Sequence, residues 1–72
     1  MKREPVTSAA LRSVGYDPET WTLEVEFVSG DVYQYLEVEP EDVEALIRSG
    51  SMGRFLNQHI KPRYQYVDLG RG

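Results

Sequence analysis

Hydrophobic and polar residues alternate most regularly over residues 21–27. Trp21, Leu23, Val25 and Phe27 occupy every second position, and the residues between them are polar. A half-buried antiparallel strand shows this period of two, with one face on the core and one in water. Ser29-Gly30 then favours a turn, so the pattern predicts a β-hairpin with a return strand over residues 32–38.

The length of the hairpin loop decides which face Tyr33 and Tyr35 occupy. A two-residue loop pairs Phe27 with Val32 and leaves both tyrosines on the outer face. A three-residue loop pairs Phe27 with Tyr33 and turns both tyrosines to the core. A change of one residue moves every side chain to the other face. Both alternatives stay open, but tyrosines at strand spacing usually pack, so we favour the core face.

A helix follows the predicted hairpin. Pro40 suits the first turn of a helix. Val43, Leu46 and Ile47 form an apolar stripe at the i, i+3, i+4 spacing, and Gly50 is a plausible stop.

A second short helix should begin at Ser51, a good N-cap residue, and end before Pro62. Its apolar face is spaced at i, i+3, i+4, i+7 and i+8, and comprises Met52, Phe55, Leu56, His59 and Ile60. Less regular patterns predict further strands over residues 11–17 and 64–69.

These elements predict an α+β fold, in which a small antiparallel sheet of three to four strands carries two short helices on one face. With 72 residues, the chain should form a single domain over 1–72, with loose ends at about 1–5 and 70–72. The expected core comprises Trp21, Leu23, Val25, Phe27, Leu36, Val43, Leu46, Ile47, Phe55, Leu56 and Ile60.

Charge is unevenly distributed along the chain. Residues 1–12 carry +2, residues 13–44 carry ten acids and no base, and residues 45–72 carry +4, which gives the net charge of −4. Either the basic part meets an anionic partner, or the acidic and basic parts neutralise one another inside the domain. The absence of cysteine fits a cytoplasmic protein. No apolar stretch is long enough to span a membrane, so we expect no membrane partner.

Catalysis finds little support in the sequence. There is no thiol nucleophile, and His59, the sole histidine, lies two turns along the same helix from Ser51. That geometry does not make a serine–histidine nucleophile. One histidine and scattered acids also lack metal-ligand spacing. We therefore expect no catalytic residues, metal or cofactor.

The stronger signal is a group of basic and polar residues interleaved with aromatic rings near the C-terminus. This combination suits RNA or single-stranded nucleic acid, because cations contact phosphates and rings stack on bases. The candidates are Arg54, Gln58, Lys61, Arg63, Tyr64 and Tyr66. Ser51 and Gly53 are candidates for an anion site at the helix start. The alternative is a protein-interaction module that uses the acidic hairpin or an exposed sheet edge.

The order of several short motifs resembles the KTSC domain, a family named for the C-terminus of certain bacterial lysyl-tRNA synthetases. The matching motifs are Val14-Gly15-Tyr16-Asp17, Leu23 to Phe27 with Ser29-Gly30, Tyr33-Gln34-Tyr35, Ser51 to Asn57, Ile60-Lys61 and Tyr64. The resemblance covers roughly residues 6–66. It implies a small α+β domain without known catalytic residues, for which RNA binding has been suggested. One departure is Glu39, which separates Val38 from Pro40, whereas the family usually has Val-Pro there.

Overall fold

The computed structural model of the protein describes residues 1–71 and contains a five-stranded antiparallel sheet, with strands paired in chain order. Three to four strands were expected. The elements are β1 (Glu4–Pro5), β2 (Leu11–Asp17), β3 (Thr22–Phe27), β4 (Asp31–Tyr35), α1 (Pro40–Arg48), α2 (Met52–Phe55), the π-helical segment η1 (Leu56–Ile60) and β5 (Tyr66–Arg71). The additional strand is β1, whose two residues are too few to show an alternating pattern.

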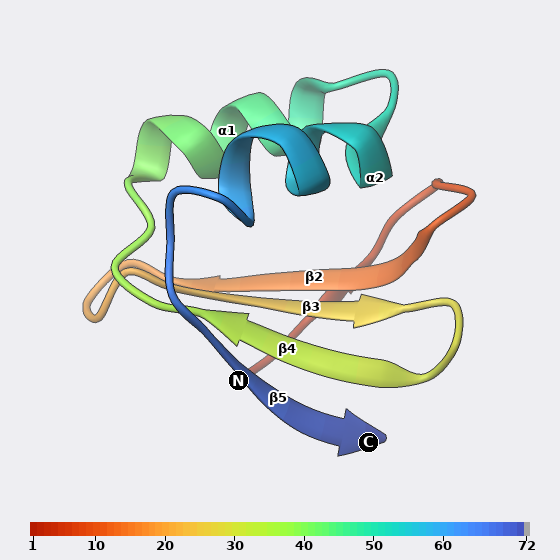
Figure 1. The fold of residues 1–72 in the computed structure, drawn as a ribbon, viewed down its shortest axis with the longest axis horizontal. Helices are drawn as coiled ribbons and strands as arrows, with labels where there is room; N and C mark the ends of the chain where they lie inside the picture. Colours follow the sequence, from red (N-terminus) through yellow and green to blue (C-terminus); the bar gives the residue numbers. More distant parts are fainter. Residues whose placement is uncertain (72) are drawn as a thin grey trace.

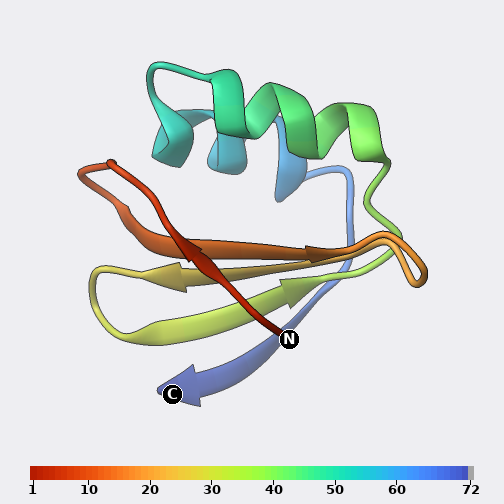
Figure 2. The same ribbon diagram turned by 180° about the vertical axis from the view of Figure 1, so that it is seen from behind.

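The helices cover one face of the sheet, and the N-terminal segment crosses the other (Figures 1 and 2). β1 pairs with β2 through Glu4 and Val14. Gly15 makes this crossing possible, since a Cβ at that position would lie 2.6 Å from the carbonyl oxygen of Lys2. The two-layer α+β architecture predicted from the sequence is therefore correct. No helix within residues 1–71 has the length and apolar character needed to span a membrane.

The hairpin β3–β4 adopts neither of the two expected registers. Leu23 pairs with Tyr35, and Val25 pairs with Tyr33. Both tyrosines nevertheless lie on the same face as Leu23 and Val25, as we favoured. Tyr35 is buried and Tyr33 is half-buried. Burial raises the pKa of the Tyr35 phenol to about 12, with smaller contributions from the neighbouring tyrosines.

Most of the expected core is confirmed. Leu23, Val25, Val43, Leu46, Leu56 and Ile60 are buried. Phe27 and Phe55 are half-buried and pack against this cluster. Leu36 is half-buried just beyond β4. The expected core list did not include six buried apolar residues, namely Leu11, Val14, Val32, Tyr35, Val38 and Met52.

Two expected core residues lie on the surface. Trp21 is 42% exposed, because its backbone adopts a left-handed conformation (φ 57°) that interrupts the alternation just before β3. Its carbonyl accepts a 2.7 Å hydrogen bond from the Val38 amide, which holds the turn in place. Ile47 is 50% exposed, because α1 buries only the narrow stripe of Val43 and Leu46.

The second helix changes type along its length. Four α-helical residues, Met52–Phe55, continue without a break into the π-helical segment η1. Its buried residues Met52, Leu56 and Ile60 are spaced four apart. In a regular α-helix, eight residues rotate a side chain about 80° away from its starting direction, whereas the wider π turn keeps Ile60 in line with Met52.

Segments near both ends of the chain are attached to the sheet. Arg3 is hydrogen-bonded to the sheet, and residues 66–71 form β5. Looseness of the ends in solution stays a prediction, and Gly72 lies outside the described residues.

Candidate nucleic-acid interface

A groove of about 480 Å³ lies between the loop before β2 and the loop that joins α1 to α2. Residues 7–10 form one wall, and residues 49–53 form the other. Arg54 and Asn57 project from the following helical segment and complete the lining. Hydroxyl, amide and guanidinium groups thus line a surface groove assembled from segments some forty residues apart.

Local contacts hold both walls in place. The Ser8 hydroxyl accepts hydrogen bonds from the amides of Ala10 and Leu11 at 3.2 and 3.3 Å, and this fixes the loop before β2. Gly53 lies against Ala10, and a Cβ on Gly53 would be only 2.6 Å from the Cβ of Ala10. The groove is therefore preformed by packing.

The two predicted anion-site residues both line this groove, but the capping hydrogen bond expected from Ser51 is not formed. The Ser51 amide donates to the Ser49 hydroxyl at 3.1 Å. Gly53 is half-buried, since Ala10 occupies the space its side chain would fill. Both residues shape the groove, and anion binding by either stays a prediction.

Arg54, Gln58 and Lys61 are all exposed on the second helical segment, but the π-helical turn between them changes the rotation that the i, i+4, i+7 spacing assumes, so a single shared side stays a prediction. Within residues 1–71, none of the three makes an ion pair or a side-chain hydrogen bond. Asn57, which pattern reasoning did not single out, borders the same surface from the groove side. We call Arg54, Gln58 and Lys61 the basic face.

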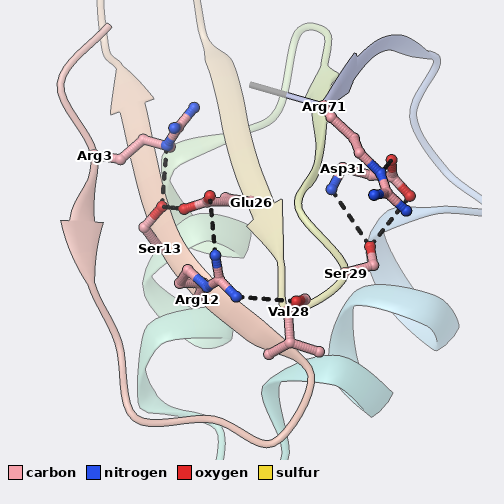
Figure 3. A network of polar contacts seen from close by, with 8 residues as sticks. All are labelled: Arg3, Arg12, Ser13, Glu26, Val28, Ser29, Asp31 and Arg71. Atoms are coloured by element: carbon pink, nitrogen blue, oxygen red, sulfur yellow. Dashed lines mark hydrogen bonds and ion pairs between the residues drawn. The ribbon is translucent and has the colours of Figure 1, made fainter.

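The other basic residues are mostly neutralised within the domain. Five ion pairs are formed in residues 1–71, and each joins an acid of residues 13–44 to a base outside that range. The pairs are Arg3–Glu24, Arg12–Glu26, Arg48–Glu44, Arg63–Asp42 and Arg71–Asp31. Figure 3 shows the contacts that tie Arg12 to Glu26 and Val28, and Arg3 to Ser13. Much of the charge asymmetry along the chain is thus removed by folding.

Arg63 and Tyr64 make contacts within the fold, and their role in nucleic-acid binding stays a prediction. Arg63 pairs with Asp42 at 3.1 Å and lies 5.5 Å over the Tyr64 ring. The Tyr64 hydroxyl donates to the same carboxylate and accepts from the Glu39 amide. Burial, followed by the hydrogen bond to Asp42, raises the pKa of Tyr64. Together these contacts attach the chain after η1 to the first turn of α1.

Tyr66 belongs to an aromatic cluster on the helix-covered face of the sheet. Its ring stacks on Tyr33 at 5.1 Å with an angle of 7°, and Tyr33 meets Phe27 edge-to-face at 5.3 Å. Asp68 lies opposite Tyr33 in the β4–β5 register, and its charge is the main reason that the pKa of Tyr33 is raised. One ring face of Tyr66 is therefore occupied, and a carboxylate lies close by.

His59 is exposed, and its ring lies 4.7 Å from that of Phe55. Within residues 1–71, no three acidic or histidine side chains converge in an arrangement that would hold a metal ion.

Fold and surface together define a small sheet-and-helix domain with a preformed groove and a basic helical face. The profile of the KTSC domain family matches residues 7–64. The chain therefore belongs to the KTSC domain family, as the sequence motifs indicated.

Relatives of the chain include both small proteins and parts of larger ones. An uncharacterized protein of Stutzerimonas stutzeri is 54% identical over 67 residues, which cover 92% of this chain and 94% of that protein. The lysine–tRNA ligase of Nostoc punctiforme is 34% identical over 61 residues, which cover 85% of this chain but only 11% of the ligase. The crystal structure of a KTSC domain protein from Yersinia pestis has a TM-score of 0.90 and 35% identity, and the match covers 96% of this chain and 97% of that one.

Proposed function

We propose that this domain is a non-catalytic accessory module that binds RNA or single-stranded nucleic acid through its basic face. The observation that carries the proposal is the lack of internal partners for Arg54 and Lys61, whereas five of the eight basic residues are ion-paired. Exposed cations without protein partners on one helical segment are suited to phosphate contacts. We also propose that the domain acts in the cytoplasm, where such partners occur.

The groove supports the proposal because it continues the basic face. Arg54 belongs to both, and Asn57, Ser51 and Thr7 add hydrogen-bonding groups beside it. Amide and hydroxyl side chains commonly contact phosphate and sugar oxygens. Similarity to part of a lysine–tRNA ligase is consistent with a role beside RNA.

Binding should be weak and moderately salt-dependent. Two cations engage about two phosphates, so the slope of log K against log salt should be about −1.4 for a single strand. The net charge of −4 opposes association further.

The experiment is an amide NMR titration with single-stranded RNA, first at low and then at physiological salt. Shifts should gather on residues 51–61 and fade with salt. A variant with Arg54→Ala and Lys61→Ala should lose most of the affinity. Arg48→Ala is the matched control, because Arg48 is also exposed but is paired with Glu44 at 2.9 Å. Equal losses in both variants, or no shifts at low salt, would contradict the proposal.

A variant that adds a negative charge tests the groove separately. A Cβ at Gly50 would meet no atom within 4 Å, so Gly50→Asp should leave the fold intact. It adds a negative charge to the groove lining and should therefore weaken RNA binding. Gly50→Ala, which adds no charge, is its control.

The second candidate is a protein-interaction module, and the structure narrows its possible surface. Glu24, Glu26 and Asp31 of the hairpin are ion-paired, which makes an acidic docking face there less suitable. The exposed edge strand β5 remains, with Val67 and Leu69 on the surface.

A further inference from the structure

The two edges of the sheet differ in how they are protected against pairing with another strand. β1 has only two residues, one of which is Pro5, and proline has no amide hydrogen to donate. β5 has six residues with neither proline nor lysine, and it is paired only with β4. Sheet edges of soluble proteins usually carry such protective residues. β5 does carry a bulge at Leu69, and its Gly70 amide donates to the Asp68 carboxylate at 2.8 Å, so the open part of this edge is the backbone on either side of that contact.

Exposed apolar side chains gather on this same strand. Val67 is 44% exposed and Leu69 is 49% exposed, and the partly exposed ring of Tyr66 begins the strand. In Figure 1, β5 lies at the side of the sheet farthest from the helices. Backbone groups and apolar side chains at this edge therefore suit an added β-strand.

The register of β5 makes a second copy of the same strand a suitable partner. Tyr66 pairs with Tyr35 and Arg71 pairs with Asp31, and these two β4 residues, four apart, lie on one face. Residues five apart in a regular strand would lie on opposite faces. A bulge at Leu69, where the register shifts between Val32 and Tyr33, brings Tyr66 and Arg71 to the same face.

Two β5 strands paired antiparallel about a two-fold axis need Tyr66 and Arg71 on the same face. The reason is that residues directly opposite one another in such a pair must share a face. If all six residues overlap, Tyr66 lies opposite the partner's Arg71, and Val67 lies opposite the partner's Gly70. The partner's Arg71 can then contact the Tyr66 ring and reach diagonally toward Asp68. Its side chain is 79% exposed, and its own pair with Asp31 is long, at 3.9 Å.

We propose that β5 pairs with β5 of a second copy of this chain, so that two domains form one continuous antiparallel sheet. Six residues from each copy are few compared with the 20–30 per side of a stable interface, so the dimer should be weak and concentration-dependent. This inference is independent of nucleic-acid binding, because β5 and the basic face share no residue.

The test is sedimentation velocity of the whole chain, without nucleic acid, from 10 µM to 1 mM. The weight-average sedimentation coefficient should rise over this range. Val67→Lys should hold the protein as a monomer, because it places one charge from each copy within the new pairing. Ile47→Lys is the matched control, since Ile47 is equally exposed but lies on α1. Thermal unfolding of both variants verifies that they are folded.

A mixed sample of ¹³C-labelled and unlabelled chains tests the register directly. Intermolecular NOEs between the Tyr66 ring and the Arg71 side chain are expected, since the two lie at opposite ends of one strand within a single chain. A monomer at every concentration would overturn the proposal. So would association that Val67→Lys leaves unchanged, including association through a different surface.

Discussion

Gly53 and Ala10 lie so close together that a methyl group on the glycine would be 2.6 Å from the methyl group of the alanine. Real Cβ atoms do not approach this closely, so one wall of the groove or the other would have to move. Gly53→Ala should therefore lower the free energy of unfolding by about 1–3 kcal/mol. Urea denaturation monitored by Trp21 fluorescence measures the loss.

Two further variants separate this contact from a general effect of adding a methyl group. Gly50→Ala has open space around its new Cβ and should be neutral or stabilise by about 0.5 kcal/mol. Combining Gly53→Ala with Ala10→Gly moves the methyl group to the other side of the contact and should recover part of the stability. If the combined variant is no more stable than Gly53→Ala alone, steric crowding is not the cause.

Arg3 and Glu24 provide the second prediction. Their side chains approach to 2.6 Å, and Glu24, which is only 6% exposed, also accepts a hydrogen bond from the Gln34 amide at 2.8 Å. Arg3→Ala leaves a buried carboxylate without its cation, which should cost about 1–3 kcal/mol because Arg3 itself is partly exposed. Arg12→Ala, at an exposed pair of 3.8 Å, should cost less than about 1 kcal/mol. Chemical denaturation of both variants makes the comparison, and equal losses would argue against the special role of the buried pair.

The raised pKa of Tyr35 predicts a loss of stability in alkali. The pKa is about 12 in the folded protein and about 10 in the unfolded chain, so between these values the unfolded state binds fewer protons. Stability is therefore fully present below pH 10 and falls as the pH rises toward 12, by up to about 2–3 kcal/mol from this group. Unfolding free energies of the wild type and Tyr35→Phe, measured from pH 9 to pH 12, should diverge over this window. Parallel curves would show that Tyr35 is not responsible.

Tyr64→Phe distinguishes an anchoring tyrosine from a base-stacking one. The substitution keeps the ring but removes the hydroxyl that joins Asp42 and the Glu39 amide. We expect a loss of about 1–2 kcal/mol in stability, since a hydrogen bond to a charged group is lost. RNA affinity should be unchanged below the unfolding transition. A variant of normal stability with weakened RNA binding would instead assign Tyr64 to the interface.

Local patterns predicted the central part of the fold well. Alternation located β3 to within one residue, and the expected strand over residues 11–17 matches β2. The prediction that Trp21 belongs to the core was wrong, because alternation carries no information on the left-handed backbone at Trp21, just before β3. β1 was missed because two residues cannot show a period, and its position depends on the absence of a side chain at Gly15.

For the candidate site, too, local spacing accounts for contacts along one helical segment but not for contacts between distant segments. Arg54, Gln58 and Lys61 are all exposed on the second helical segment, and their grouping into one binding site stays a prediction. Arg63 and Tyr64 were grouped with them by proximity in sequence, yet the chain turns after η1 and brings both to α1. The second wall of the groove comes from residues 7–10, a contact between distant segments that helix spacing cannot predict.

The π-helical segment has a consequence for how the length of this chain can vary. A π turn is an α-helical turn that holds one extra residue. Removing a single residue from 57–59 would let the segment close as an ordinary α-helix, with the isoleucine that ends η1 three residues after Leu56 and still directed toward the sheet. A one-residue deletion, which in β3 would turn half of the strand inside out, should at this position leave a domain that folds.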